Sequence, residues 1–168
     1  MRYNEFMELV PINAKSLKRA LQILRQGGIV AHPADTCFGL AGDFTNPKAL
    51  KKLQALKGRS GVKPMSIMLP APFKDRLEEY AVLNDFSREI CERLFPGPVT
   101  LLLPKGPRIP KWYFPESTLI GIRIPYDTFT QDLLIAFKGP LITTSANLSG
   151  ETVCCYSGEL IDIFKDQR

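Results

Sequence analysis

Short apolar runs alternate along this chain with amphipathic stretches whose apolar residues recur every three or four positions. The run VTLLL at 99–103 is typical of a buried strand, whereas residues 16–26 place their leucines on one face of a helix. Strands mixed with helices in this way predict an α/β sheet covered by helices. The length of 168 residues suits one domain, 1–168, with a sizeable core and little room for a second.

Cap and turn residues refine the expected elements. Asn46-Pro47 is typical of a helix start, because asparagine supplies the cap oxygen and proline suits the first helical position. Gly27-Gly28 ends the first helix, FPGP at 95–98 breaks the chain, and residues 32–40 are expected to form a loop. We expect helices at 16–26, 47–57, 72–80, 84–95, 129–137 and 160–164, and strands at 29–31, 65–69, 99–103, 119–124 and 141–144.

Composition narrows the class of protein. The formal net charge of +5 favours an anionic partner, nucleotide phosphates or RNA. No apolar run approaches the ~20 residues of a membrane helix, and the N-terminal MRYNEFMELVPINAK has acids where a signal peptide is apolar. We therefore predict a cytoplasmic protein outside the membrane. The four cysteines include no C-x-x-C pair and the chain has one histidine, so we predict reduced thiols and no metal site.

Two segments favour anion binding. Lys57 and Arg59 lie at the end of the second helix, and Lys63 follows them, so three cations can converge on one anion. The alternative is a basic helix C-terminus that complements the helix dipole. Ser145 and Asn147, at the end of an apolar strand, can bond phosphate or ribose oxygens. The alternative for this segment, SANLSG, is a capping turn.

Two further segments carry candidate polar groups. Asp35 and Thr36, in the loop after the first strand, can orient a small polar substrate, and His32 is either an acid or base or a structural residue. Arg123 lies in the apolar run GIRIP, where an unpaired charge would be costly, so it needs either a carboxylate ligand or an internal Asp or Glu. The chain has no G-x-x-x-x-G-K-[ST] loop and no G-x-G-x-x-G fingerprint.

Together these motifs resemble the YrdC/TsaC family of threonylcarbamoyl-AMP synthases over roughly residues 13–152. The resemblance rests on five segments in the family's order: PADTCFGL at 33–40, Lys57-Gly58-Arg59 with Lys63-Pro64, PGPVTLLL at 96–103, GIRIP at 121–125 and SANLSG at 145–150. It implies a twisted mixed sheet with flanking helices around a concave, basic cavity. The additional C-terminal domain of longer relatives is not expected here.

The resemblance also implies an activity. L-Threonine, bicarbonate and ATP, with Mg²⁺ accompanying the ATP, would give threonylcarbamoyl-AMP and pyrophosphate. A downstream tRNA threonylcarbamoyl transfer complex would then modify the adenosine beside the anticodon. Lys57 and Arg59 would be catalytic. The implied ATP-binding residues are Lys57, Arg59, Lys63, Thr118, Ser145 and Asn147, and the implied threonine-binding residues are Thr36, Arg123 and Thr143.

The sequence departs from the family in three places. Ala34 stands for a threonine beside the amino-acid pocket. Met68 stands where many relatives have a histidine or another residue that contributes to this pocket, and the chain after residue 150 lacks the usual late strand. Two alternatives stay open: a non-catalytic module of the same fold that binds tRNA or double-stranded RNA, and a carbamoyl-transferring relative. The intact set Lys57, Arg59, Ser145 and Asn147 favours the synthase.

Overall fold

The computed structural model describes residues 9–58 and 63–164, which form a six-stranded mixed sheet flanked by helices. The strand order is β1-β2-β6-β3-β5-β4; β3 and β5 are parallel, and the other neighbours are antiparallel. This confirms the predicted α/β architecture. In chain order the elements are α1 Ala14–Arg25, β1 Val30–His32, β2 Gly39–Asp43, α2 Pro47–Leu56, β3 Ser66–Met68, η1 Ala71–Glu79, α3 Asp85–Leu94, β4 Leu101–Pro104, β5 Leu119–Arg123, α4 Thr128–Phe137, β6 Leu141–Ser145 and α5 Ser157–Phe164.

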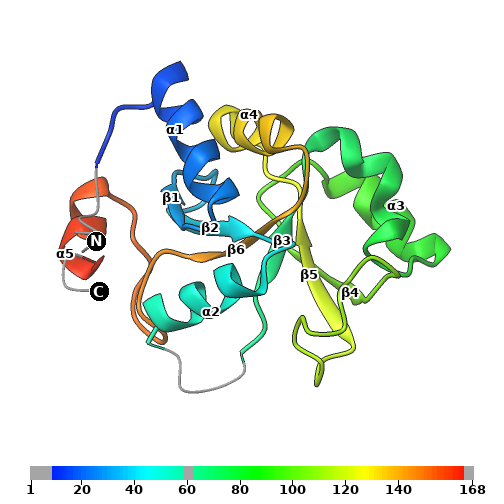
Figure 1. Cartoon of the computed structure of the whole chain (residues 1–168). Coiled ribbons are helices and arrows are strands. Elements are labelled where there is room, and N and C mark those ends of the chain that lie inside the picture. Colours follow the sequence, from blue (N-terminus) through cyan, green and yellow to red (C-terminus); the bar gives the residue numbers. More distant parts are fainter. Residues whose placement is uncertain (1–8, 59–62, 165–168) are drawn as a thin grey trace.

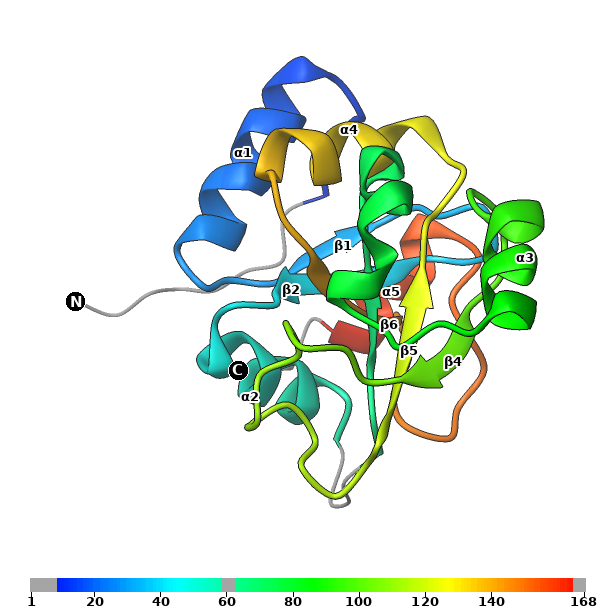
Figure 2. The ribbon, with the colours of Figure 1, turned by 90° about the vertical axis from the view of Figure 1, so that its right-hand side faces the viewer.

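Helices cover both faces of the sheet. Figures 1 and 2 show α1 and α4 side by side on one face and α2 on the other. Short polar side chains fix where these helices begin: Asn46 Oδ1 accepts a hydrogen bond from the backbone of Lys48 at 3.0 Å, as the sequence predicted for this cap. Asn13 and Ser16 form a reciprocal capping box, so α1 begins earlier than expected.

Each face of the sheet has its own buried cluster. Ala41, Met68 and Leu141 pack with α1 and α4, whereas their strand neighbours Ile67 and Ile142 pack in the cluster that includes the buried leucines of α2. Because successive residues of a strand point to opposite faces, the cluster to which one residue belongs shows which face each other residue of that strand points to.

The sequence missed one strand. Gly39–Asp43, sequence GLAGD, forms β2, hydrogen-bonded on one side to β1 and on the other to β6. Its two glycines and lack of β-branched residues give it little strand propensity, so neighbours on both sides decide its conformation. Gly42 allows close packing of α2, because a Cβ there would lie only 3.2 Å from Ala49 Cβ.

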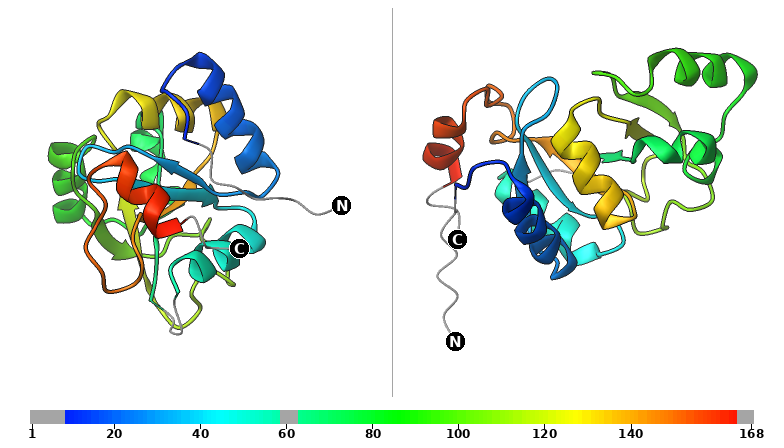
Figure 3. Two further views of the ribbon diagram at one scale, coloured as in Figure 1. Left: turned by 90° about the vertical axis from the view of Figure 1, so that its left-hand side faces the viewer. Right: turned by 90° about the horizontal axis from the view of Figure 1, so that it is seen from above.

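The last helix lies beside the β1 end of the sheet, opposite β4 (Figure 3). Its buried residues Leu160 and Phe164 join the core cluster that includes α2 leucines, so the expected helix at 160–164 is confirmed and begins earlier, at Ser157. Within the described ranges, none of the helices combines the length and apolar character that a membrane crossing requires.

Candidate active site

Three predicted site residues, from two separate segments of the chain, share one face of the sheet. Met68 pairs with Arg123 of β5 and with Leu141 of β6, and Met68 and Leu141 both belong to the cluster under α1 and α4. Arg123 therefore points to that face, and strand alternation adds Thr143 and Ser145 to it. All three side chains are partly exposed, so this face presents hydroxyl groups and a guanidinium to solvent.

Lys57, at the C-terminal end of α2, is almost fully buried against the turn that follows β6. Its Nζ donates to the Ser145 carbonyl at 2.7 Å and to Asn147 Oδ1 at 2.6 Å, and lies 3.5 Å from Ser145 Oγ. The backbone N–H of Ser149 in turn donates to the Lys57 carbonyl at 2.9 Å. The two motifs, 88 or more residues apart in the chain, thus form one unit.

Further hydrogen bonds fix the geometry of this turn. Ser145 Oγ donates to Asn147 Oδ1 at 2.6 Å, and Asn147 Nδ2 donates to the Glu151 carbonyl at 2.6 Å. The amide oxygen thus receives two donors, including an ammonium, and the amide nitrogen finds a carbonyl, so the amide orientation is unambiguous. The segment SANLSG is both a structured turn and the wall that holds a buried cation.

Arg123 has an internal partner, which decides between the alternatives left open by the sequence. Its Nη2 forms an ion pair with Asp35 Oδ1 and donates to Thr36 Oγ1 at 3.2 Å. The other Asp35 oxygen accepts from the backbone N–H of Tyr126 at 3.1 Å. Burial lowers the pKa of Arg123 from its ordinary value, although the group stays cationic at neutral pH. The β1–β2 loop is thereby tied to the end of β5.

His32 is buried beneath the same loop and has defined hydrogen-bond partners. Its Nδ1 lies 2.8 Å from the Pro33 carbonyl and 3.0 Å from Thr130 Oγ1, and the Thr130 hydroxyl donates to that same carbonyl at 3.0 Å. A carbonyl only accepts, so Nδ1 carries the proton and Nε2 has a lone pair. Nε2 is buried without a partner and faces Gly39, where a Cβ would lie 2.9 Å from it. The ring is held in place, which favours the structural interpretation.

Acidification should destabilise this protein through His32. Burial lowers the pKa of His32 from its ordinary 6.5; the nearby Asp127 acts in the opposite direction and Arg123 in the same direction. Between the lowered folded value and the unfolded value the unfolded chain binds more protons, so the free energy of unfolding falls as pH drops below about 6.5. The slope should reach up to about 1.4 kcal/mol per pH unit.

Urea unfolding between about pH 5.5 and 7.5 measures this effect. Since His32 is the one histidine of the chain, His32→Gln is the matched control and should flatten the profile in this window. A variant with the same pH dependence as the parent would contradict the assignment.

Two of the remaining predicted residues, Thr118 and Lys63, are exposed. Thr118 has an exposed side chain, and its carbonyl accepts from the backbone N–H of Lys105 at 2.9 Å. Lys63 is exposed just before β3. Arg59 lies outside the described residues. Met68 is buried in the cluster under α1 and α4, and its neighbour in register is Arg123.

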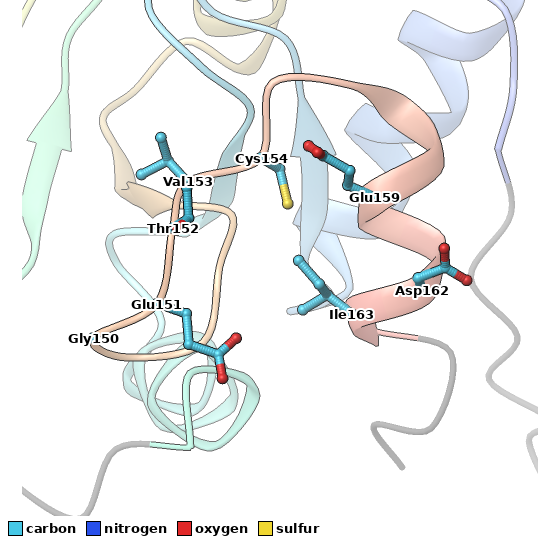
Figure 4. Close-up of a pocket in the computed structure, with 8 residues that line it drawn as sticks. All are labelled: Gly150, Glu151, Thr152, Val153, Cys154, Glu159, Asp162 and Ile163. Atoms are coloured by element: carbon cyan, nitrogen blue, oxygen red, sulfur yellow. The ribbon is translucent and has the colours of Figure 1, made fainter.

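Two hollows border this region. One, of about 540 Å³, lies between residues 150–154 and α5. Figure 4 shows that Glu151, Glu159 and Asp162 are among the side chains around it, so its lining is unsuited to phosphate. The second, of about 270 Å³, lies over the β3, β4 and β5 strands. It is lined by Pro64, Met65, Ser66, Leu102, Ser117, Leu119 and Gly121.

The sequence could not identify the partners that hold this site together. Asp35 and Arg123 are 88 residues apart, and His32 and Thr130 are 98 residues apart, so no local pattern connects them. Across the described part of the chain, no group of three or more His, Cys, Asp or Glu side chains is arranged to hold a metal ion.

Known proteins resemble this chain over most of its length. Residues 22–168 match the Sua5/YciO/YrdC family, described as telomere recombination. Threonylcarbamoyl-AMP synthase from Mus musculus is 39% identical over 150 residues, 89% of this chain and 52% of the mouse protein. The synthase from Yersinia enterocolitica is 34% identical over 145 residues, 84% of this chain and 75% of that protein.

The same resemblance holds in three dimensions. Sua5 of P. abyssi, solved in complex with L-threonine, superposes with a TM-score of 0.84 at 25% identity, covering 94% of this chain and 46% of that one. This chain thus spans about half the length of the mouse protein and of the archaeal Sua5, and its description as a single domain stays a prediction. Sequence and fold together lead to one conclusion: the chain belongs to the Sua5/YciO/YrdC family.

Proposed function

We propose that this chain makes threonylcarbamoyl-AMP and pyrophosphate from L-threonine, bicarbonate and ATP. The observation that carries the proposal is the unit formed by Lys57, Ser145 and Asn147 at the end of β6, where the Ser145 side chain shares a sheet face with Arg123. The Lys57 ammonium would attract the phosphates of a nucleotide, and the Arg123 guanidinium would attract a second anion on the neighbouring strands. Relatives at 34% identity or more bear the name of this synthase.

The nucleotide would bind on the Lys57 side. Lys57 and Arg59 would contact the triphosphate as the catalytic cations, with Lys63 as a third, and Ser145 and Asn147 would fix phosphate or ribose oxygens. The 270 Å³ hollow, with apolar walls such as Met65 and Leu119, suits a flat base. Thr118 lies in the chain between Ser117 and Leu119, which line this hollow, and it is the weakest of the proposed contacts. Mg²⁺ would enter with the ATP, bound to its phosphates.

Threonine would bind on the Arg123 side, next to the β1–β2 loop. Arg123 would hold the carboxylate, because only one of its nitrogens, Nη2, makes the hydrogen bonds to Asp35 and Thr36, and its Nε is buried without a partner. Thr36 and Thr143 would meet the polar groups of the amino acid. The adjacent carboxylate of Asp35 gives this side both signs of charge, which matches a zwitterion.

The chemistry needs no covalent enzyme intermediate. The threonine amine adds to bicarbonate with loss of water to give a carbamate, and a carbamate oxygen attacks the α-phosphorus and expels pyrophosphate. Carbamate, triphosphate and carboxylate are all anions and repel one another. Lys57, Arg59 and Arg123 would offset that repulsion and hold the reactants in line, so positioning and electrostatics would supply the rate.

The product is a mixed anhydride, which needs an acceptor. We propose that a tRNA threonylcarbamoyl transfer complex consumes it and that the net charge of +5 permits contact with tRNA in the cytoplasm. No contact among the described residues favours the alternatives, an RNA-binding module without activity or a carbamoyl-transferring relative.

The test is product formation. The purified chain, incubated with ATP, bicarbonate and L-threonine, should release pyrophosphate and threonylcarbamoyl-AMP, detected by mass spectrometry. L-Serine and D-threonine serve as controls for the amino-acid site. A folded protein that binds ATP and forms no product would refute the proposal.

A further inference from the structure

Three of the four cysteines gather around the loop that carries Thr36. Cys37 follows Thr36 in the β1–β2 loop, and Cys154 and Cys155 lie in the segment between β6 and α5. The two segments are joined by a backbone hydrogen bond, in which the N–H of Phe38 donates to the Cys154 carbonyl at 3.0 Å. Cys37 and Cys154 are thus brought together by the tertiary structure, although they are 117 residues apart in the chain.

We propose that Cys37 and Cys154 form an oxidisable thiol pair, a modification site that closes to a disulfide on reaction with a small-molecule disulfide and thereby disables the neighbouring site. Both thiols are free in the structure. The Cα atoms of Cys37 and Cys154 are separated by the Phe38–Cys154 hydrogen bond and the peptide atoms on either side of it. This spacing is comparable to the ~4.4–6.8 Å between the Cα atoms of disulfide-bonded cysteines.

The surroundings of the two thiols suggest the order of reaction. Cys37 is partly exposed, whereas Cys154 is buried. Burial raises the pKa of the Cys154 thiol, and Glu159, Cys155 and Cys37 act in the same direction, so Cys154 is a poor first nucleophile. Cys154 also lines the 540 Å³ hollow, together with Glu159 (Figure 4).

The exchange balances in two steps. The Cys37 thiolate attacks a disulfide RSSR, forming Cys37–S–SR and releasing one RSH after proton uptake. The Cys154 sulfur, losing its proton, then attacks the Cys37 sulfur, forming the Cys37–Cys154 disulfide and releasing the second RSH. The two protein thiols are oxidised by two electrons, and RSSR is reduced to two thiols.

The other cysteines are weaker partners. Cys154 and Cys155 are adjacent, and consecutive Cα atoms are ~3.8 Å apart, below the usual span of a disulfide. Cys155 is exposed and available for simple mixed-disulfide formation, which makes it a useful internal comparison. Cys91 is buried on α3, away from this cluster.

The disulfide would act on the site through Thr36. Thr36 Oγ1 lies 3.9 Å from Cys37 Sγ and accepts from Arg123 Nη2 at 3.2 Å. A covalent link at Cys37 would pull this hydroxyl and the Asp35 carboxylate from the guanidinium. The expected loss of activity rests on the proposed function; formation of the disulfide does not. A displacement of about 1 Å is sufficient for a loss of about 10²-fold.

The experiment uses oxidised glutathione as the disulfide. The parent chain and the variants Cys37→Ser, Cys154→Ser and Cys155→Ser are incubated with it, blocked with an alkylating agent, digested and analysed by mass spectrometry. We expect a linked peptide pair containing Cys37 and Cys154 in the parent and in Cys155→Ser, and its absence from the other two. Synthase activity should fall about 10²-fold in the two linking proteins and recover with dithiothreitol.

Separate readouts keep the two claims apart. Folding of each variant is checked by circular dichroism, and Cys37→Ser, at a partly exposed loop position, guards against misfolding of the buried Cys154→Ser. Modification of Cys155 alone, or a Cys37–Cys155 link, would overturn the proposed pair. A linked protein that keeps the activity of the reduced protein would overturn the coupling to the site. A reduced parent without activity but with the linked peptide refutes the proposed function and leaves the thiol pair standing.

Discussion

Replacing Lys57 with methionine should lower kcat/KM for threonylcarbamoyl-AMP formation by about 10²–10³-fold, the loss typical of a removed group that stabilises developing charge. The Lys57 ammonium is anchored by the Ser145 carbonyl and Asn147 Oδ1, so its position is fixed by the turn that follows β6. Affinity for ATP, measured by calorimetry on the folded variant, should fall in parallel. Pyrophosphate release gives the rate.

The same variant should also be less stable. The Ser145 carbonyl and Asn147 Oδ1 each lose the ammonium donor and each keep one other donor, so we expect the loss typical of hydrogen bonds to a charged group, about 1.5–3 kcal/mol. The matched control is Lys51→Met, which replaces an exposed lysine of α2. It should keep the activity of the parent and change the free energy of unfolding by no more than about 0.5 kcal/mol. A Lys57→Met protein that is destabilised and yet turns over like the parent would reduce Lys57 to a structural residue.

Replacing Arg123 with methionine should raise KM for threonine by about 10–100-fold, equivalent to losing a charged hydrogen bond of about 1.5–3 kcal/mol. It should also cost about 3–5 kcal/mol of stability, because Asp35 is left as an unpaired, mostly buried carboxylate. Calorimetric titration with threonine and urea unfolding measure the two effects separately.

A double variant separates the two roles of this arginine. Asp35→Asn combined with Arg123→Met removes both charges, so much of the lost stability should return while threonine binding stays weak. Arg88→Met breaks an exposed ion pair with Glu78 and should leave the free energy of unfolding close to that of the parent. Recovery of threonine binding in the double variant would show that Arg123 only supports the loop.

The elements with strong local signals could be predicted from the sequence. The helix after Asn46-Pro47 was predicted because the cap needs only neighbouring atoms, and the strands around Ile67, Ile122 and Ile142 because their apolar runs are buried. The strand at Gly39–Asp43 could not be predicted, because pairing with β1 and β6 supplies its stability.

The candidate site was likewise predictable only in part. Its residue types were evident in the sequence: cations after a helix, hydroxyl and amide groups after a strand, an arginine in an apolar run. The partner of each residue was not evident, since a charge in an apolar run needs a partner but the run itself does not identify it. For Arg123 the answer is Asp35, and for Lys57 it is the turn of Ser145 and Asn147.

The family was therefore determined by the sequence alone, because its motifs are short, local and arranged in a fixed order along the chain. Only the tertiary structure decided which groups meet. Strand pairing moved Arg123, Thr143 and Ser145 to one face, and the end of α2 buried Lys57 among oxygens rather than leaving it on a solvated helix end. It also brought Cys37 to Cys154, because hydrogen bonds and packing join segments regardless of their distance along the chain.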